Sequence, residues 1–243
     1  MVEIQPNVPD DLSPYKIQSL PPNFYYIPNF LTPSESEYLL QKISTNRWTQ
    51  LSHRRLQAHP STLTKTNTLL SAPLPTYLTT FPPITERFSK IRIFKDTPHK
   101  SANHVLINEY KPGEGIMPHE DGGAYAHVVA TISLGASIVL DIYDKRGDGD
   151  VENENEKGVR RRILQEPGSL LVTTGEAYTS LLHGIEEIER DEGLGEDGVV
   201  NWKLLGDKSK FEGGVNERGT RVSLTYRDVL KVSKVGIGIL GRR

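Results

Sequence analysis

The chain has 243 residues, of which 36% are hydrophobic and 25% charged, and its formal net charge is -2. This length suits one large domain that buries most of its apolar surface, so we expect a single domain over residues 1–243. The absence of cysteine excludes disulfides, thiolate catalysis, and zinc or iron–sulfur sites with Cys ligands. Because the net charge is close to zero, nucleic-acid binding would require a local basic surface.

The N-terminal residues lack the basic segment and apolar run that are typical of a signal peptide. No apolar stretch of the sequence approaches the roughly 20 residues that a membrane-spanning helix needs. We therefore expect no membrane partner and an intracellular location, in the cytoplasm, the nucleus or both. The basic residues of the C-terminal tail are too sparse to indicate a nuclear signal.

For residues 24–100 we predict a helical extension, and its clearest signal is a helix start. Thr32 is a good N-cap, Pro33 fits the first helical position, and Glu35 completes a capping box. Apolar residues at helical spacing follow, so the pattern predicts a helix over Pro33–Ser44.

Other parts of the N-terminal region carry weaker signals. Residues 1–23 are rich in proline and polar residues and predict an extended arm. A second helical stretch is predicted over Ile84–Ile93, after a Pro-Pro pair. Residues 53–68 have few periodic apolar positions and predict a loop.

Residues 101–230 contain short segments rich in β-branched and aromatic residues, separated by turn signals. These segments are HVLINEY, HVVATISL, SIVLDIY, RRILQ, SLLVTT and TRVSLTYR. They predict a mainly β fold with flanking helices, as a sandwich, a jelly roll or a small barrel. Residues 144–158 and 186–219 are acidic and Gly-rich, which predicts two long, mobile insertions between strands.

Three residues predict a metal site. His119 and Asp121 are two positions apart, so on extended backbone their side chains point to the same face. His183, in the segment LLHGI, offers a third ligand. Two histidines and one carboxylate form the facial triad of non-haem Fe(II) oxygenases, which leaves coordination positions open. Taken alone, the same residues also fit a surface histidine beside a turn-capping aspartate, and a buried histidine bonded to a carbonyl.

The segment RVSLTYR at residues 221–227 carries a second motif. Strand alternation places four polar side chains on one face: Arg221, Ser223, Thr225 and Arg227. Because a guanidinium binds a carboxylate through two parallel hydrogen bonds, two such arginines suit a dicarboxylate. The alternative is a solvent-facing edge strand with ordinary surface arginines.

Taken together, these segments resemble the AlkB family, and in particular the subfamily of AlkB homologue six. The resemblance is carried by NHVLINEYKPGEGIMPHEDG, TISLGASIVLDIYD, GSLLVTTGEAYTSLLHGI and RVSLTYR. It covers residues 103–227 and includes the earlier stretch FYYIPNFLTPSESEYLL. It implies a double-stranded β-helix (jelly-roll) core over residues 101–230.

The resemblance implies an Fe(II)- and 2-oxoglutarate-dependent dioxygenase. Iron would be held by His119, Asp121 and His183, which are then also the catalytic residues. The implied reaction consumes O2 and 2-oxoglutarate, gives succinate and CO2, and hydroxylates a substrate C–H bond. On an N-methyl group the product breaks down and releases formaldehyde.

The resemblance also assigns the co-substrate site. Arg221 would pair with the distal carboxylate of 2-oxoglutarate. Arg227 would lie near the other carboxylate and the ligand aspartate. Asn108 and Tyr110 match the pair that hydrogen-bonds the co-substrate.

Nucleic acid is the partner that the family implies, and an alkylated base would have to be flipped out or already single-stranded. Tyr125, Tyr178 and Trp48 are candidates to stack on that base, with ordinary core packing as the alternative for each. Candidate phosphate contacts are Arg54, Arg55, Lys90, Arg92, Lys95 and Lys100.

Two other functions remain open from the sequence. The chain could oxidise protein side chains, or it could be a weakly active nucleic-acid-binding module on the same fold. The acidic insertions would repel phosphates if they lie near the pocket. The sequence leaves the oligomeric state open.

Overall fold

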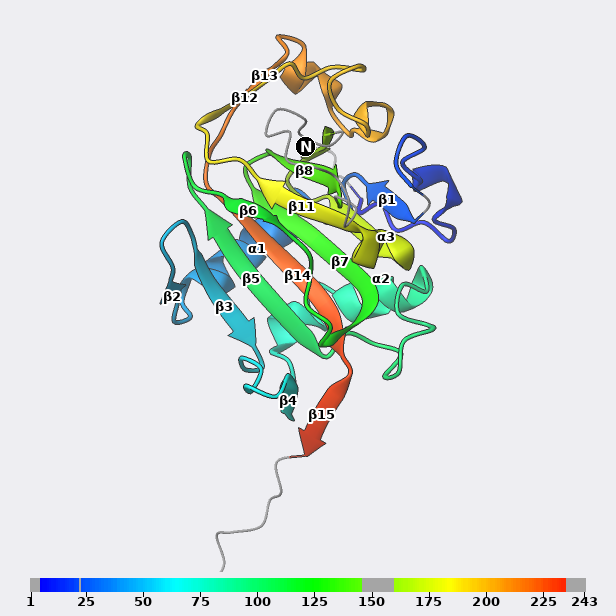
Figure 1. Ribbon diagram of the computed structural model, residues 1–243, viewed down its shortest axis with the longest axis vertical. Helices are drawn as coiled ribbons and strands as arrows, with labels where there is room; N and C mark the ends of the chain where they lie inside the picture. The colour runs from blue at the N-terminus through cyan, green and yellow to red at the C-terminus, as the bar shows by residue number, and fades with distance from the viewer. Residues whose placement is uncertain (1–4, 22, 146–159, 235–243) are drawn as a thin grey trace, which may run out of the picture.

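The computed structural model describes residues 5–21, 23–145 and 160–234. Its largest element is an antiparallel sheet of seven strands in the order β1-β10-β7-β14-β5-β3-β2, with β14 in the middle (Figure 1). The strands of this large sheet are β1 Phe24–Ile27, β2 Thr49–Gln50, β3 Arg55–His59, β5 His104–Tyr110, β7 Tyr125–Gly135, β10 Leu170–Thr174 and β14 Arg221–Val229.

A smaller antiparallel sheet has the order β6-β11-β8-β9. Its strands are β6 Ile116–His119, β8 Ile138–Asp144, β9 Arg160–Gln165 and β11 Leu181–Ile185. Two short pairs complete the strands: β12 Arg190–Glu192 with β13 Val215–Glu217, and β4 Thr68–Ser71 with β15 Lys231–Lys234. The six segments that the sequence predicts as strands all form strands.

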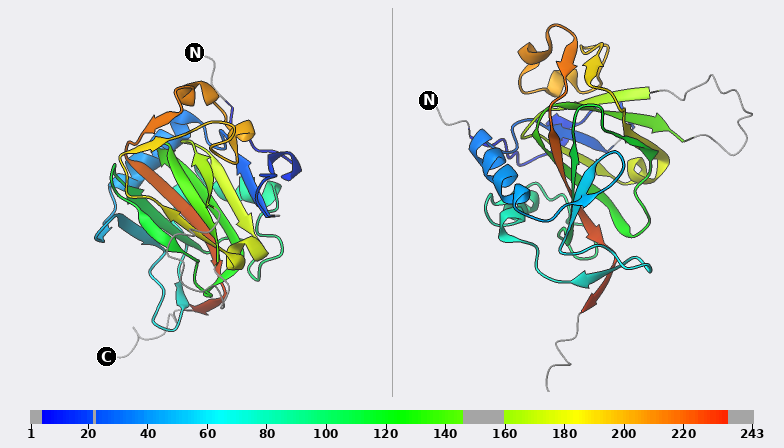
Figure 2. Two further views of the ribbon diagram at one scale, coloured as in Figure 1. Left: turned by 45° about the horizontal axis from the view of Figure 1, so that its top comes forward. Right: turned by 90° about the vertical axis from the view of Figure 1, so that its left-hand side faces the viewer.

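The molecule is built in layers. The small and large sheets face each other across a pocket that is lined from both. Helices α1 (Pro33–Ser44) and α2 (Ile84–Lys90) cover the other face of the large sheet (Figure 2), and a short helix α3 (Glu176–Ser180) precedes β11. The predicted mainly β fold with flanking helices and a jelly-roll core is therefore confirmed. Among the described residues, no helix has the length and apolar character to cross a membrane.

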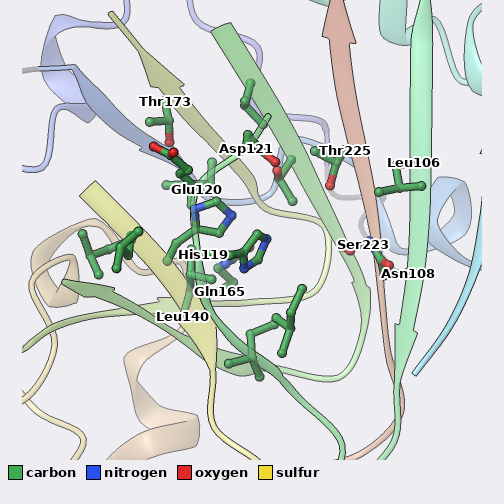
Figure 3. A pocket seen from close by; sticks show the side chains of 18 of the residues that line it. Leu106, Asn108, His119, Glu120, Asp121, Leu140, Gln165, Thr173, Ser223 and Thr225 are labelled. Atoms are coloured by element: carbon green, nitrogen blue, oxygen red, sulfur yellow. The ribbon is translucent and has the colours of Figure 1, made fainter. Parts of the chain in front are cut away.

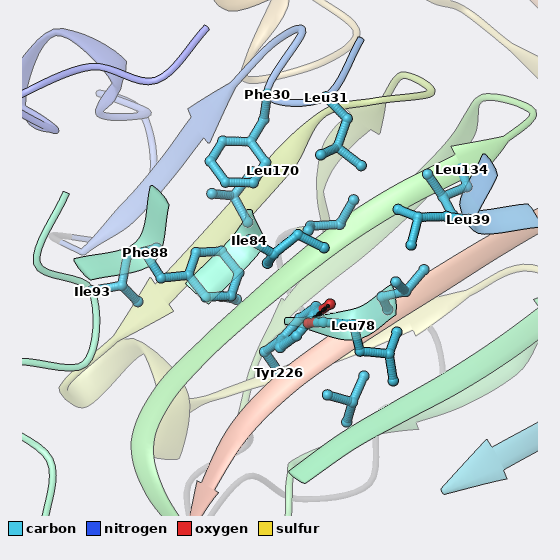
Figure 4. Packing of buried hydrophobic residues seen from close by; sticks show 14 of the residues in the cluster. Phe30, Leu31, Leu39, Leu78, Ile84, Phe88, Ile93, Leu134, Leu170 and Tyr226 are labelled. Carbon is cyan, nitrogen blue, oxygen red and sulfur yellow. Dashed lines mark hydrogen bonds between the residues drawn. The ribbon is translucent and has the colours of Figure 1, made fainter. Parts of the chain in front are cut away.

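The main hydrophobic core lies between the helices and the large sheet (Figure 4). Leu39 of α1 and Phe88 of α2 pack there against apolar residues of β5, β7, β10 and β14. Tyr226 of β14 is 2% exposed, and its hydroxyl donates to the carbonyl oxygen of Leu78 at 3.0 Å, so its one polar atom has a partner.

Helix α1 has the bounds that its capping signals predict. The Glu35 amide donates to Thr32 Oγ1 at 3.1 Å, and the Thr32 amide donates to Glu35 Oε2 at 2.9 Å. Glu35 also accepts from Arg87 of α2, at 2.9 and 2.5 Å. One carboxylate thus caps the first helix and ties the second helix to it. Helix α2 ends before the predicted Ile93, because Arg92 has a left-handed backbone with φ 57°.

The prediction of a loop over residues 53–68 is wrong in part, because Arg55–His59 forms β3, paired with β5. The one buried residue of β3 is Gln57, whose amide donates to the Ile43 carbonyl oxygen at the end of α1 at 2.9 Å. A polar residue at the inward position removed the hydrophobic alternation that reveals a strand. The helical extension at residues 24–100 accordingly contains four strands as well as its helices.

The N-terminal arm is packed rather than simply extended. A 3-10 turn forms over Ser13–Tyr15, and Lys16 makes a β-bridge with Tyr25 of β1. Ile17 is 1% exposed and Leu20 is 5% exposed, so both belong to the core. Isolated apolar residues in a polar segment gave no periodic signal.

Residues 186–219 lie between strands β11 and β14, as predicted for an insertion, but they are packed rather than mobile. The segment contains β12, β13 and two 3-10 turns, Trp202–Leu204 and Lys208–Phe211. Its few large apolar residues point into a second core cluster with β1, β8 and β9: Leu194, Val199, Leu205 and Phe211. The other predicted insertion, at residues 144–158, lies outside the described residues from position 146 onward.

A buried ion pair holds the 186–219 segment together. Arg218 donates to both oxygens of Asp191, at 3.0 and 2.6 Å, and their side chains are 2% and 0% exposed. Asn216 donates to the same carboxylate at 2.9 Å. The two charges neutralise each other away from water, which explains how charged side chains of this segment can be buried.

We predict that Asp191→Ala lowers the free energy of unfolding by about 3–5 kcal/mol, because it leaves the Arg218 guanidinium buried without a counter-ion. Urea denaturation measures the loss. Glu217→Ala is the control, since it removes only the exposed pair with Arg190 at 3.2 Å and should cost under about 1 kcal/mol. Equal stability of the two variants would contradict the role of the buried pair.

Candidate active site

The pocket between the two sheets has a cavity volume of about 310 Å³. Strands β5, β7, β10 and β14 of the large sheet line one side, and β6, β8, β9 and β11 of the small sheet line the other. Every described residue that the sequence singled out for iron or 2-oxoglutarate lies in this lining, which Figure 3 shows from close by.

Strand pairing brings the three predicted metal ligands together. In the register of β11 against β6, His183 lies opposite His119, and their ring centroids are 4.4 Å apart. Asp121 follows directly after β6, and one ligand atom from each of the three residues lies within 4.8 Å of the others. Gly184 permits this close approach of the strands, because a Cβ there would lie 3.0 Å from the Ile116 carbonyl oxygen.

The orientation and charge of the donor groups suit a divalent metal. His119 Nδ1 donates to the Met117 carbonyl oxygen at 2.9 Å, which leaves Nε2 as the ring nitrogen for a metal. Burial lowers the pKa of His183 to about 4, so its ring is neutral at physiological pH. Burial raises the pKa of Asp121, but the charge and hydrogen bonds of Arg227 act in the opposite direction and the pKa is lowered overall, so the carboxylate is ionised.

Arg227 fixes the orientation of the ligand aspartate. Its Nη2 lies 2.5 Å and its Nε 3.3 Å from the two oxygens of Asp121. The guanidinium stacks over the ring of Tyr125, 4.9 Å from its centroid, and is 7% exposed. The planar fork therefore restrains both carboxylate oxygens while the imidazoles approach from the opposite sheet. Two imidazoles and one ionised carboxylate fit Fe(II), with positions left for further ligands.

Arg221 forms a second charged centre in the pocket. Its Nη2 donates to Ser133 Oγ at 2.8 Å and to Gln165 Oε1 at 2.9 Å, and burial lowers its pKa to about 10. The side chains of all three residues are almost fully buried. In the part of the chain that the structure describes, no carboxylate pairs with this guanidinium. A buried cation that has only neutral acceptors requires an anion from the ligand.

Asn108 and Tyr110, which the family resemblance assigns to the co-substrate, line the pocket and lie on β5 beside β14. They pair in register with Ser223 and Arg221. Arg221 lies over the Tyr110 ring, 5.9 Å from its centroid. The alternative of an edge strand with surface arginines is wrong, because β14 is central and all nine of its residues are buried.

Three residues that hydrogen-bond to Arg221 or Asn108 were not identified from the sequence as parts of the site. Ser133 and Gln165 hold Arg221, and Arg54, assigned to a phosphate-contacting surface, lines the pocket and donates to Asn108 Oδ1 at 3.2 Å. A serine and a glutamine within strands carry no motif of their own. Only the pairing of distant strands reveals these contacts.

The three aromatic residues that were predicted to stack on a base differ in where they lie. Tyr125 lines the pocket. The side chain of Tyr178, in α3, lies outside the described residues. Trp48 does not line the pocket; it packs against the main core, with Arg55 over its ring at 4.4 Å, so its prediction as a stacking residue is wrong.

The six candidate phosphate contacts do not form one surface. Arg55 pairs with Glu109 at 2.7 Å, and Lys90 pairs with Asp10 at 3.2 Å. Only Arg54 lines the active pocket; three others line a different hollow: Arg92, Lys95 and Lys100.

Comparison with known proteins agrees with this site. The model of the 2OG-Fe(II) oxygenase superfamily matches residues 23–227. "Probable RNA/DNA demethylase ALKBH6" of Danio rerio is 38% identical over 238 residues, which cover 96% of each chain. "tRNA (carboxymethyluridine(34)-5-O)-methyltransferase alkbh8" of Xenopus tropicalis is 28% identical, over 87% of this chain and 32% of that protein. The solved structure of OsALKBH1 gives a TM-score of 0.51 at 16% identity, covering 87% of this chain and 99% of that one.

The chain belongs to the 2OG-Fe(II) oxygenase superfamily and, within it, to the AlkB family. It is therefore a dioxygenase whose cofactors are Fe(II), 2-oxoglutarate and O2, and the donor set of the pocket fits them. The OsALKBH1 likeness, at its low identity, shows the shared jelly-roll fold.

We predict that Gln165→Glu weakens 2-oxoglutarate binding about tenfold or more, a change of about 1.4 kcal/mol. The new carboxylate would pair with Arg221 and neutralise the guanidinium, which would then bind the distal carboxylate of the co-substrate less strongly. Calorimetric titration of 2-oxoglutarate into the Mn(II)-loaded protein under argon measures the affinity without turnover.

Two controls accompany this titration. Arg221→Ala should lose about 1.5–3 kcal/mol of 2-oxoglutarate binding, the contribution of a charged hydrogen bond. Mn(II) affinity should stay unchanged in both variants, because neither residue is a metal ligand. Parent-like 2-oxoglutarate affinity in both variants would refute the assignment of Arg221 to the distal carboxylate.

Proposed function

We propose that this enzyme demethylates alkylated nucleobases in RNA or DNA by oxidation. The observation that carries the proposal is the complete site: three metal ligands and both arginines converge on one pocket. The relative from Danio rerio, similar over nearly its whole length, is named for RNA/DNA demethylation, and that from Xenopus tropicalis for a tRNA modification.

The protein's own residues have distinct tasks in this reaction. Arg221 and the polar residues around it hold the co-substrate by one end, and Arg227 keeps Asp121 in its ligand orientation. Iron, when bound, supplies the oxygen activation that side chains cannot perform. Apolar walls exclude water and bring the methyl group of the base near the metal: Leu140, Ile142, Leu171 and Leu181.

Tyr125 is the described residue best placed to contact a base. It lines the pocket, is half-buried, and lies under the guanidinium of the arginine that holds Asp121. An extruded base would pack against aromatic and apolar side chains at such a position.

Oxidation of a protein side chain is the second candidate. Glu120 lines the pocket, and a carboxylate there would favour a basic side chain over a phosphate. Its pairing with Lys145 reduces this effect, because the ammonium neutralises the carboxylate.

Location in the cytoplasm or the nucleus stays a prediction.

We predict that the parent enzyme releases formaldehyde and succinate in equal amounts from N-methylated single-stranded RNA or DNA. Asp121→Ala should abolish both products, because it removes a metal ligand. Asp207→Ala, at a site outside the pocket, is the matched control and should retain parent activity.

The same assay separates the alternatives. Succinate production that methylated oligonucleotides do not stimulate, but methylated lysine or arginine peptides do, would replace the nucleic-acid proposal with the protein one. Tight RNA binding without turnover in the parent would favour a binding module. Retained turnover in Asp121→Ala would refute the metal assignment.

A further inference from the structure

A second hollow lies on the opposite side of the large sheet from the active pocket. Alternation along β14 separates the two, since Thr225 and Arg227 line the active pocket and Tyr226 between them lines this hollow. The hollow has a volume of about 380 Å³ and continues into a neighbouring cavity of about 410 Å³. The two cavities share four lining residues, Leu74, Thr85, Ser101 and Ala102. We call this continuous depression the rear groove.

The rear groove concentrates positive charge. Among the described residues its lining includes three basic side chains and no acidic one: Arg92, Lys95 and Lys100. Lys95 lies 3.7 Å from the carboxylate of Asp96, and both side chains are largely exposed, so the pairing is weak. Within the described ranges, neither Arg92 nor Lys100 forms an ion pair. In a chain with 31 acidic and 29 basic residues, such a one-sided lining marks an anion-binding surface.

Two of these basic residues have an unusual backbone conformation. Five described non-glycine residues have a positive φ, and three of them are asparagines, which tolerate the left-handed region. The other two are Arg92, with φ 57°, and Lys100, with φ 55°. Turn hydrogen bonds hold both, from their amides to the carbonyl oxygens of Ser89 at 3.2 Å and Thr97 at 3.1 Å. The fold keeps long basic side chains where asparagine or glycine would suit the backbone better, which indicates a use for their charge.

The uncharged lining indicates which anion fits. Hydroxyl groups accompany the cations along both cavities: Thr79, Thr80, Thr85, Ser89 and Ser101. Lysine, arginine, serine and threonine side chains are the groups with which proteins contact phosphate oxygens. A groove that extends over two cavities suits a ligand with repeated phosphates rather than a single one.

The floor of the groove is aromatic but closed. Phe88, Phe94 and Tyr226 are 4%, 3% and 2% exposed. The ring centroids of Phe94 and Tyr226 lie 5.8 and 5.0 Å from that of Phe88, and Figure 4 shows Phe88 beside Tyr226. Because these rings are occupied by each other, they leave no face on which a base could stack. Contact with a strand would therefore be made to its backbone and not to its bases.

We propose that the rear groove binds the sugar–phosphate backbone of a nucleic-acid strand, independently of base sequence. The proposal rests on nucleic acid being the substrate class and adds a contact outside the active pocket. The groove supplies cations on the side of the large sheet opposite to the pocket that Glu120 lines.

The test uses the full chain and a fluorescein-labelled single-stranded RNA of about 20 nucleotides, long enough to occupy one site. The groove variant combines Arg92→Asn with Lys100→Asn, which removes two cations and introduces a residue that accepts left-handed backbone. The matched control combines Lys208→Asn with Lys210→Asn, which removes two exposed cations from a segment outside the groove. Fluorescence anisotropy gives the affinity at several salt concentrations.

We expect the groove variant to bind RNA about tenfold more weakly than the parent, and the control to bind as the parent does. The slope of log affinity against log salt should fall by about 1.4, since each lost phosphate contact removes about 0.7 for single strands. Lys95→Ala, which leaves the left-handed positions unchanged, should weaken binding in the same direction.

Three results would overturn the proposal. The first is an unchanged RNA affinity in the groove variant, and the second is an equal loss of RNA affinity in the groove and control variants. The third is that a polyglutamate peptide displaces the labelled RNA from the protein as effectively as unlabelled RNA does. Formaldehyde release is measured separately. A parent that binds RNA through the groove but releases no formaldehyde would refute the proposed function and leave the groove assignment standing.

Discussion

Strand β14 lies in the middle of the large sheet, hydrogen-bonded to β7 on one side and β5 on the other. Val222, Leu224 and Tyr226 pack under the helices, and Arg221 and Arg227 alternate with them toward the pocket. A slip of one residue in either register would exchange the two faces, so burial of the apolar face also fixes where both guanidinium groups lie. The helical layer on one side thereby determines the chemistry possible on the other.

The two arginines of this strand differ in how their charge is balanced. Arg227 is paired with Asp121 within the protein, so it serves the geometry of the metal ligand. Arg221 is surrounded by the neutral oxygens of Ser133 and Gln165, so its charge remains for a ligand carboxylate. Strand β14 thus provides Arg227, which orients the metal ligand, and Arg221, a cation without a counter-ion in the protein. A dicarboxylate that chelates the metal requires this arrangement.

Much of the site was predictable because its signals are local or carried by a family resemblance. The spacing of His119 and Asp121 and the alternation of polar and apolar residues in RVSLTYR can be recognised in the sequence without knowledge of the fold. The errors share a different cause, which is polar groups that satisfy each other across long separations. Because Gln57 occupies the inward position of β3, this strand lacks a hydrophobic pattern. Because Asp191 and Arg218 pair with each other, a packed segment has the composition of a polar loop. Such partnerships appear only once distant strands are paired.

Anaerobic titration of the apo-protein with Fe(II) and 2-oxoglutarate tests the central assignment most directly. The chelated complex has a weak visible charge-transfer band, which reports metal and co-substrate in one site without any knowledge of the substrate. We predict that the band forms in the parent and is absent in His183→Ala, with both proteins folded by circular dichroism. A folded parent without the band, or a His183→Ala variant that retains it, would contradict the site described here.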